Sequence, residues 1–187
     1  MILKTPLRLA IAVGWCAAAL LCLPLAGQEQ FSTRTPSVTL EPVPQATLQR
    51  GSAHAVELHF RVSAGFHVNS NKPSEEFLIP TVLTLEPPTD IIVGRVTYPA
   101  GELTSFPFAP DQKLSVYAGE FTVSVLVRPM ASVLPSEYAV HGTLKYQACD
   151  NAACYPPKRL PVEFNVKVVK APPPHRANPP QSPNAHN

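Results

Sequence analysis

The sequence predicts an all-β fold, an antiparallel sandwich of two sheets, from three observations. Apolar and polar residues alternate with a period of two in several segments, as they do in strands buried on one face. Turn-forming pairs such as Ala64-Gly65, Pro87-Pro88 and Ala118-Gly119 separate these segments. No stretch shows helical periodicity, and 23 prolines among 187 residues favour loops and strands over helices. Short strands at this spacing are typical of a sandwich.

Four segments show the clearest alternation, and each predicts a strand with one buried face. The residues expected to point inward are Val56, Leu58, Phe60 and Val62; Phe121, Val123, Val125 and Val127; Val140, Gly142, Leu144 and Tyr146; and Val162, Phe164, Val166 and Val168. Less regular strands are expected at 38–41, 66–69, 81–85, 91–98 and 114–117. The total is about eight or nine strands.

The N-terminus has the order of a secretory signal peptide. Lys4 and Arg8 provide positive charge, residues 9–25 are largely apolar, and Ala26 and Gly27 are small. We therefore expect residues 1–27 to be a signal peptide, with an uncleaved membrane anchor as the alternative. Residues 28–35 are expected to be a flexible lead-in and 36–170 the folded domain. The proline-rich segment 171–187 is expected to be disordered.

The charge of the chain argues against two classes of partner. The formal net charge is +2, from 15 basic and 13 acidic residues. Without Lys4 and Arg8 of the leader, the balance is 13 − 13 = 0. A neutral domain without basic clusters does not predict binding to nucleic acid or to an anionic membrane surface. Hydrolase motifs and phosphate-binding glycine loops are also absent from the sequence.

Two cysteines remain once the leader is set aside. Cys16 and Cys22 lie within the leader, which leaves Cys149 and Cys154. In an oxidising compartment this pair should form a disulfide, with Cα atoms roughly 4.4–6.8 Å apart. The closed loop is short and would stabilise the fold by only about 2 kcal/mol, which favours a redox-active pair over a structural disulfide.

Two other interpretations of the cysteines stay open at this point. The disulfide could be static, within a non-enzymatic sandwich that binds a protein partner. Alternatively, the cysteines could hold copper together with His67 or His141. No cofactor or metal is otherwise expected.

The segment around these cysteines, 146–157 (YQACDNAACYPP), resembles the active loop of one known family. That family is the N-terminal periplasmic domain of the bacterial thiol:disulfide interchange protein DsbD. Further similar stretches follow the same order along the chain, at 65–73, 77–81, 98–99 and 114–119. The resemblance covers residues 36–169.

The resemblance implies an immunoglobulin-like sandwich that relays reducing equivalents in the periplasm. In the family, a membrane-embedded electron transporter supplies the electrons through a thioredoxin-like domain. The acceptors include disulfide isomerases and thioredoxin-like proteins of cytochrome c biogenesis. By this resemblance Cys149 and Cys154 form the redox pair; Cys154 is expected to form the mixed disulfide and Cys149 to resolve it. Because the sequence contains neither the membrane portion nor the thioredoxin domain, we expect a separate donor protein.

The resemblance also implies that the cysteines are shielded. A cap loop bearing an aromatic residue is expected at 104–109, with Phe106 or Phe108 as the cap. Tyr146 and Tyr155 could shield the sulfurs too, although all four aromatic residues could equally be ordinary packing residues. The acidic residues that accompany the cap in the best-known members are missing here. Lys145 and Lys158 could favour a thiolate, and Asp150 would oppose one.

Overall fold

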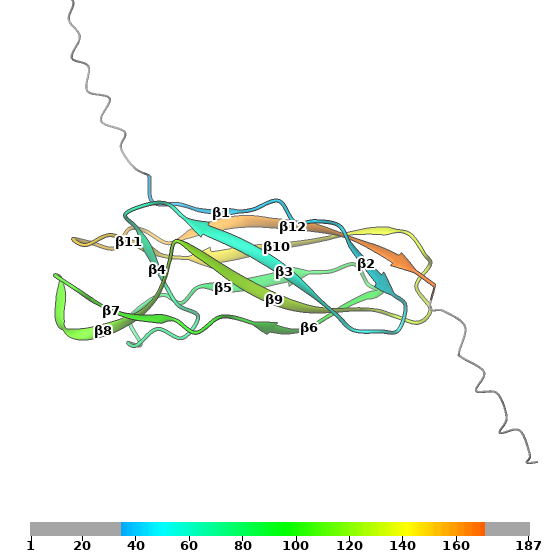
Figure 1. Ribbon diagram of the computed structural model, residues 1–187, viewed down its shortest axis with the longest axis horizontal. Coiled ribbons are helices and arrows are strands. Elements are labelled where there is room, and N and C mark those ends of the chain that lie inside the picture. Colours follow the sequence, from blue (N-terminus) through cyan, green and yellow to red (C-terminus); the bar gives the residue numbers. More distant parts are fainter. Residues whose placement is uncertain (1–34, 171–187) are drawn as a thin grey trace, which may run out of the picture. The chain divides into compact units, whose positions relative to one another are not determined.

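A computed structural model describes residues 35–170 of the chain (Figure 1). The expected signal peptide, nearly all of the expected lead-in and the expected tail lie outside the described residues. Residues 35–170 form strands, turns and loops but no helix. They accordingly include no helix that is long and apolar enough to cross a membrane.

The described residues form twelve strands in three four-stranded sheets. The first sheet has the order β1-β3-β9-β6: Val38–Leu40, His54–Val62, Glu120–Pro129 and Ile91–Thr97. The second has the order β2-β12-β10-β5: Ala46–Gln49, Lys158–Val169, Glu137–Tyr146 and Val82–Glu86. The third has the order β11-β4-β8-β7: Ala148–Cys149, His67–Asn69, Ala109–Ala118 and Glu102–Phe106. Within these sheets every pairing is antiparallel except that of β12 with β2.

The predicted fold class, an immunoglobulin-like antiparallel β-sandwich, is confirmed, and all nine expected strands are present. The structure adds β2, β7 and β11, and it gathers four strands into a third sheet. These three additions are two to five residues long. Such short segments contain too few residues to show an alternating pattern, so tertiary pairing decides them.

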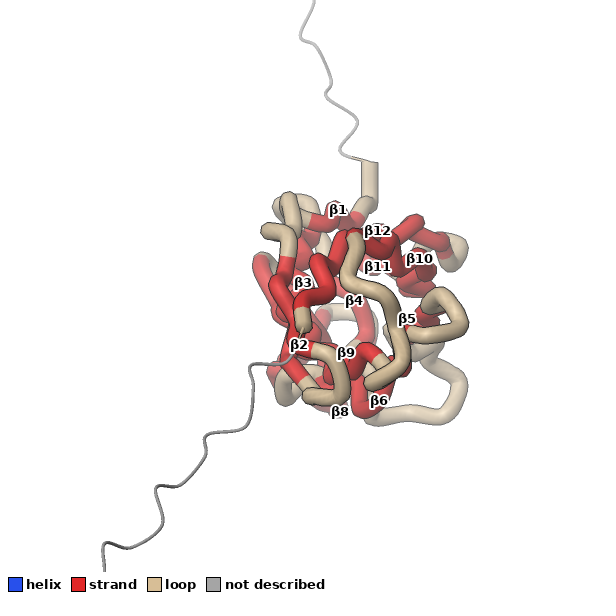
Figure 2. Tube along the Cα trace, turned by 90° about the vertical axis from the view of Figure 1, so that its right-hand side faces the viewer, coloured by secondary structure: helices blue, strands red, loops and turns tan. Residues whose placement is uncertain are grey.

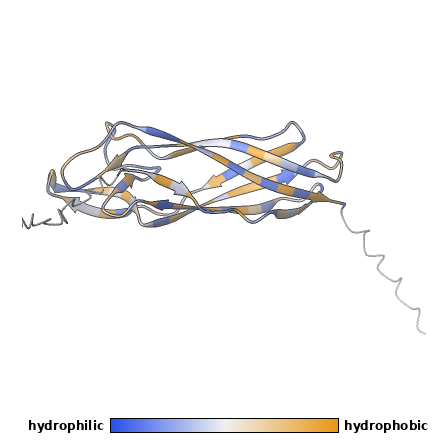
Figure 3. Cartoon of the chain, turned by 90° about the horizontal axis from the view of Figure 1, so that it is seen from above, coloured by the Kyte–Doolittle hydropathy of each residue, from blue (hydrophilic) through white to orange (hydrophobic). Residues whose placement is uncertain are grey.

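The core of the domain lies between the first two sheets and contains all the predicted inward-facing residues except Gly142, which is half-buried. Figure 2 views these strands along the long axis of Figure 1. Along β3, every second side chain from Val56 to Val62 is buried, and β9 and β12 show the same alternation. Figure 3 shows this as alternating hydrophobic and hydrophilic segments along the strands. Phe60 and Phe121, opposite each other on β3 and β9, stack with ring centroids 5.2 Å apart. Burial of these side chains supplies the main driving force for folding.

The third sheet lies at one end of the sandwich and contains Cys149, on β11 (Figure 1). Its strand β4 follows the turn at Gly65, whose φ of 85° is a conformation that glycine adopts without steric cost. Strand β8 passes to β9 through Gly119, with φ of 63°, so it leaves the third sheet for the first. β4 thereby lies between β8 and the short strand β11, which contains Cys149.

Candidate functional site

Cys149 and Cys154 are joined by a disulfide with an S–S distance of 2.02 Å. They face each other as an isolated antiparallel bridge. Two backbone hydrogen bonds of 2.9 Å flank the pair, from Asp150 N to Ala153 O and from Tyr155 N to Ala148 O. The Cα atoms are 3.9 Å apart, closer than the expected range, because opposed residues without mutual backbone hydrogen bonds approach most closely.

The two sulfur-bearing residues differ in their access to solvent. Cys149 lies on β11 and is completely buried, whereas Cys154 lies outside the sheet and is exposed. The burial of Cys149 follows from its position, since β11 pairs with β4 on one side of it. A partner protein can therefore reach Cys154, but it cannot reach Cys149 without a rearrangement.

Asp150 holds the turn between the cysteines. Its Oδ1 accepts hydrogen bonds from the backbone N–H groups of Ala152 and Ala153, at 2.8 and 2.9 Å. Its Oδ2 accepts a 2.6 Å hydrogen bond from the Tyr155 hydroxyl. These hydrogen bonds, with that of Tyr155 first, hold the pKa of Asp150 below its usual range. Asp150 thus fixes the loop geometry, a role that its charge alone did not suggest.

Two of the stretches that carry the family resemblance meet behind this loop. Asn69 Nδ2 donates to the Ile79 carbonyl at 3.0 Å and to Gln147 Oε1 at 3.5 Å. Gln147 Nε2 in turn donates to the Tyr155 carbonyl at 3.1 Å. The hydroxyl of Thr81 donates to the Asn69 carbonyl at 2.6 Å. Segments far apart in the sequence therefore brace the cysteine loop through one polar network.

Three aromatic rings, from β4, from β7 and from the turn between β7 and β8, form a stack in the third sheet. His67 on β4 is the direct cross-strand partner of Cys149, and its ring stacks on Phe106 with centroids 4.0 Å apart. Phe108 in turn stacks on Phe106, with ring centroids 5.5 Å apart. Phe106 is 7% exposed and Phe108 is 40% exposed, so Phe106 is the inner ring and Phe108 the outer one.

The expected cap loop is not a plain loop in the structure. Residues 104–106 belong to β7 and Ala109 begins β8, so the segment forms the tip of a hairpin (Figure 1). Pairing of β7 with β8, including Thr104 with Leu114, supplies the backbone hydrogen bonds that a loop would lack. Phe106 also packs with Leu78, Leu114 and Val116 in a small apolar cluster separate from the main core.

The two tyrosines beside the cysteines have different surroundings. Tyr146 is 3% exposed and belongs to the main core, where its hydroxyl accepts a 3.2 Å hydrogen bond from Val38 N. Tyr155 is half-buried, packs edge-on against Phe66 at 5.7 Å and bonds to Asp150. Tyr155 is therefore a residue of the cysteine loop, and Tyr146 links that loop to the core.

His67 is the member of the site whose position the sequence pattern did not reveal. Its side chain is buried, and its Nε2 has no hydrogen-bond partner in the structure. Burial lowers its pKa from 6.5 to about 4, against an opposing effect of the Asp150 charge. His67 is therefore neutral at pH 7. The sequence pointed to His67 in two ways, as a possible copper ligand beside the cysteines and as part of a stretch similar to the family motif. Neither placed it opposite Cys149.

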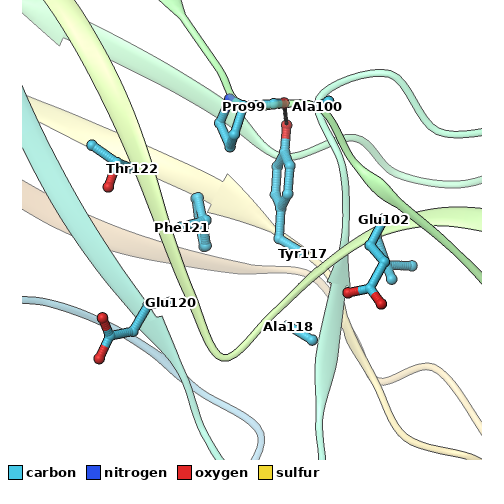
Figure 4. Close-up of a pocket in the computed structure, with 9 residues that line it drawn as sticks. Pro99, Ala100, Glu102, Tyr117, Ala118, Glu120, Phe121 and Thr122 are labelled. Carbon is cyan, nitrogen blue, oxygen red and sulfur yellow. Dashed lines mark hydrogen bonds between the residues drawn. The ribbon is translucent and has the colours of Figure 1, made fainter.

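A hollow lies between β8, β9 and the segment before β7, and none of the residues that line it belongs to the cysteine loop (Figure 4). Tyr117 points across it and donates a 3.1 Å hydrogen bond to the Pro99 carbonyl. Glu120, on its rim, forms a 2.7 Å ion pair with Arg61. The Tyr117 hydroxyl and the Glu120 carboxylate are thus already paired within the protein. Among residues 35–170, no three His, Cys, Asp or Glu side chains are grouped so as to hold a metal ion.

Comparison with known proteins identifies the family that this site resembles. The family model for the N-terminal region of the thiol:disulfide interchange protein DsbD matches residues 37–165, which include both Cys149 and Cys154. This match covers more than half of the chain. No curated protein sequence matches this chain.

Solved structures with a similar arrangement include two from Neisseria meningitidis. The reduced DsbD N-terminal domain is 24% identical, with 63% of this chain and 80% of that chain covered and a TM-score of 0.38. A complex between the DsbD and PilB N-terminal domains is also 24% identical, with 59% and 73% covered and a TM-score of 0.36. A type I cohesin from Pseudobacteroides cellulosolvens is 11% identical, with 73% and 95% covered and a TM-score of 0.43.

Proposed function

This chain belongs to the family of the thiol:disulfide interchange protein DsbD N-terminal domain, and from that premise we propose that it exchanges thiols and disulfides with thioredoxin-like proteins. The exchange takes place in the periplasm, through Cys149 and Cys154. One observation carries the proposal: the disulfide has one exposed sulfur-bearing residue, Cys154, and one buried one, Cys149. Such a pair can be attacked at one end only, which gives the exchange a defined order.

Reduction of the domain begins at Cys154. A thiolate of the donor attacks the Cys154 sulfur, the Cys149–Cys154 bond breaks, and a mixed disulfide forms between donor and Cys154. The electron pair of the broken bond stays on Cys149, which takes up a proton. A second donor thiol then attacks the donor sulfur of the mixed disulfide and releases Cys154. The donor leaves oxidised, and the domain holds two thiols.

Transfer to an acceptor reverses this order. Cys154 attacks the acceptor disulfide and forms a mixed disulfide, and Cys149 then attacks Cys154 and releases the acceptor as a dithiol. The proposed donor is a separate thioredoxin-like protein or membrane electron transporter. The proposed acceptors are periplasmic thioredoxin-like proteins, including those of cytochrome c biogenesis.

Phe106 is the proposed shield of the pair, and Phe108 its outer support. Phe106 covers His67, which lies directly opposite Cys149, and it is the more deeply buried of the two rings. Tyr155 has a different proposed task, which is to hold the loop through Asp150 rather than to cover the sulfurs.

The reduction potential of the Cys149–Cys154 bond tests the exchange. Equilibration with glutathione or dithiothreitol, followed by alkylation of free thiols, should give a value between about −270 and −180 mV, the span from thioredoxins to disulfide isomerases. A value below about −300 mV is typical of structural disulfides. It would contradict the proposal and favour a protein-binding sandwich with a static bond.

A pair of matched variants tests the order of attack. Cys149→Ala leaves the exposed cysteine free, and it should trap a thioredoxin-like protein as a stable mixed disulfide. Cys154→Ala leaves only the buried cysteine and should trap little or none. Equal trapping by both variants would contradict the assigned roles of the two cysteines.

A further inference from the structure

The ring of His67 occupies an unusual position for a histidine. It is 5% exposed, its Nε2 has no hydrogen-bond partner, and one face of the ring is covered by Phe106 at 4.0 Å. A buried polar atom without a hydrogen-bond partner destabilises the fold. An apolar side chain would fill this space without that cost, so packing alone does not account for a histidine here.

The register of the third sheet places His67 against Cys149. The two residues are direct partners in the antiparallel pairing of β4 with β11. Side chains of such partners lie on the same face of the sheet, with Cβ atoms about 4.5–5.5 Å apart. The unpartnered imidazole and the buried cysteine are therefore neighbours on one face of the sheet, and Phe106 packs on the imidazole.

The proposed exchange creates a need for a proton acceptor in this space. Cys149 must become a thiolate before it can attack Cys154, because the thiolate is the nucleophile. It is completely buried, and water cannot reach it to remove the proton. A buried thiolate without a neighbouring positive charge is also strongly disfavoured.

We propose that His67 is the proton acceptor and donor for Cys149. This inference rests on the proposed function, and it adds the residue that makes the resolving step possible. Neutral His67 takes the proton of the Cys149 thiol, and the resulting imidazolium stabilises the thiolate beside it. His67 is neutral at pH 7 and so has a nitrogen available for that proton, and the nearby Asp150 charge favours the protonated form against the effect of burial.

Protons and electrons balance over the resolving step. The Cys149 thiolate attacks the Cys154 sulfur, the Cys149–Cys154 bond forms, and the bond between Cys154 and the acceptor breaks with its electron pair on the acceptor sulfur. The imidazolium of His67 returns its proton to that leaving thiolate, directly or through water. His67 is neutral before and after the step. Over the whole exchange, from the first attack of Cys154 to the end of the resolving step, the domain is oxidised by two electrons and the acceptor is reduced by two.

Among the described residues near the ring, His67 is the group available to exchange a proton with Cys149. From β8 its cross-strand partner is Ala118, and from β7 the ring contacts Phe106; neither side chain titrates. From β11 it faces Cys149, and from the following turn the Asp150 carboxylate acts on it and favours its protonated form. Asp150 is itself held by Tyr155 and two backbone N–H groups.

Ellman's reagent separates the two steps without any partner protein. The reduced domain releases one thionitrobenzoate when Cys154 attacks the reagent, and a second when Cys149 resolves the mixed disulfide. Stopped-flow absorbance with limiting reagent resolves the two phases. His67→Phe keeps an aromatic ring against Phe106 but removes both nitrogens. His67→Gln serves as a second variant in case the first folds poorly, and His141→Phe, at an exposed histidine paired with Glu163, is the control.

We expect the second phase to slow at least tenfold at pH 7 in both His67 variants, with the first phase unchanged. The pH profile should change as well. In the wild type and in His141→Phe the second phase should be nearly flat from about pH 5 to 8, because the proton remains within the site. In the His67 variants it should rise about tenfold per pH unit, in proportion to the thiolate fraction. A purely structural role of His67 would not change this slope.

Two results would overturn the inference in distinguishable ways. An unchanged second phase and pH profile in the His67 variants, with two phases still present, would overturn the role of His67 alone. A wild-type disulfide that dithiothreitol leaves intact would overturn the proposed function, and the inference with it.

Discussion

The Tyr155 hydroxyl donates a 2.6 Å hydrogen bond to Asp150 Oδ2, so the residue after Cys154 holds the residue after Cys149. Asp150 and Tyr155 each directly follow a cysteine. The disulfide and the hydrogen bond therefore link the same two sides of the loop. This second link does not involve the sulfur atoms, so we expect it to remain when the disulfide is reduced. It can therefore keep the two thiols close enough to re-form the bond, which an exchange cycle requires.

Tyr155→Phe should raise the pKa of Asp150 toward its ordinary value, because the hydrogen bond from Tyr155 is the largest cause of its lowering. A carboxylate with a lowered pKa stabilises the fold above its ordinary pKa, and that contribution disappears as the pH falls through the folded-state pKa. The acid sensitivity of the loop should therefore change only below about pH 4. An NMR titration of the Asp150 carboxyl group measures this. Tyr138→Phe, which loses a bond to the Leu134 carbonyl instead, is the control and should leave Asp150 unchanged.

The stability of the oxidised domain should fall as the pH is lowered through the range set by His67. Its folded-state pKa of about 4 lies below its ordinary 6.5, so the unfolded chain binds the proton more readily between these values. Complete burial would make this difference worth about 3 kcal/mol, and we expect about 2 kcal/mol because solvent near the sheet edge screens part of it. Urea unfolding at pH 7 and pH 4 measures it. His67→Phe should lose about 2 kcal/mol less than the wild type on acidification; an equal loss in both proteins would contradict the prediction.

Phe106→Ala should speed the reduction of the disulfide by dithiothreitol about tenfold, because it uncovers His67 and opens the Cys149 side of the pair to a second route of attack. The substitution removes two aromatic stacks, to His67 and to Phe108, each worth about 0.5–1.5 kcal/mol. It should also cost about 3 kcal/mol of unfolding free energy, because the side chain is buried. Phe108→Ala is the matched comparison. It should have the smaller effect on both quantities, since that ring is 40% exposed; the opposite order would make Phe108 the shield.

Tyr146→Phe should destabilise the domain without changing the reactivity of the disulfide. The substitution leaves the buried Val38 N–H without its acceptor, at a cost of about 1–2 kcal/mol. Urea unfolding measures this cost, and alkylation after timed exposure to dithiothreitol measures the reactivity. A faster reduction comparable to that of Phe106→Ala would instead make Tyr146 a shielding residue.

The sequence by itself determined the class of fold and the identity of the disulfide-bonded pair. Alternation such as that from Val56 to Val62 reports directly which side chains are buried, because successive residues of a strand point to opposite faces. Cys149 and Cys154 were found because a short cysteine loop between two patterned strands is rare and lies in a recognisable motif. Both signals lie within short stretches of the sequence, so they can be recognised without knowledge of the fold.

Only the tertiary structure decided which groups surround that pair. The pairing of β11 with β4 buries Cys149 and leaves Cys154 exposed, although the two cysteines look equivalent in the sequence. The same pairing sets His67 opposite Cys149, 82 positions earlier in the chain. The β7–β8 hairpin then brings Phe106 over the His67 ring. These relationships depend on strand register between distant segments, and register follows from the packing of the whole sandwich rather than from any local pattern.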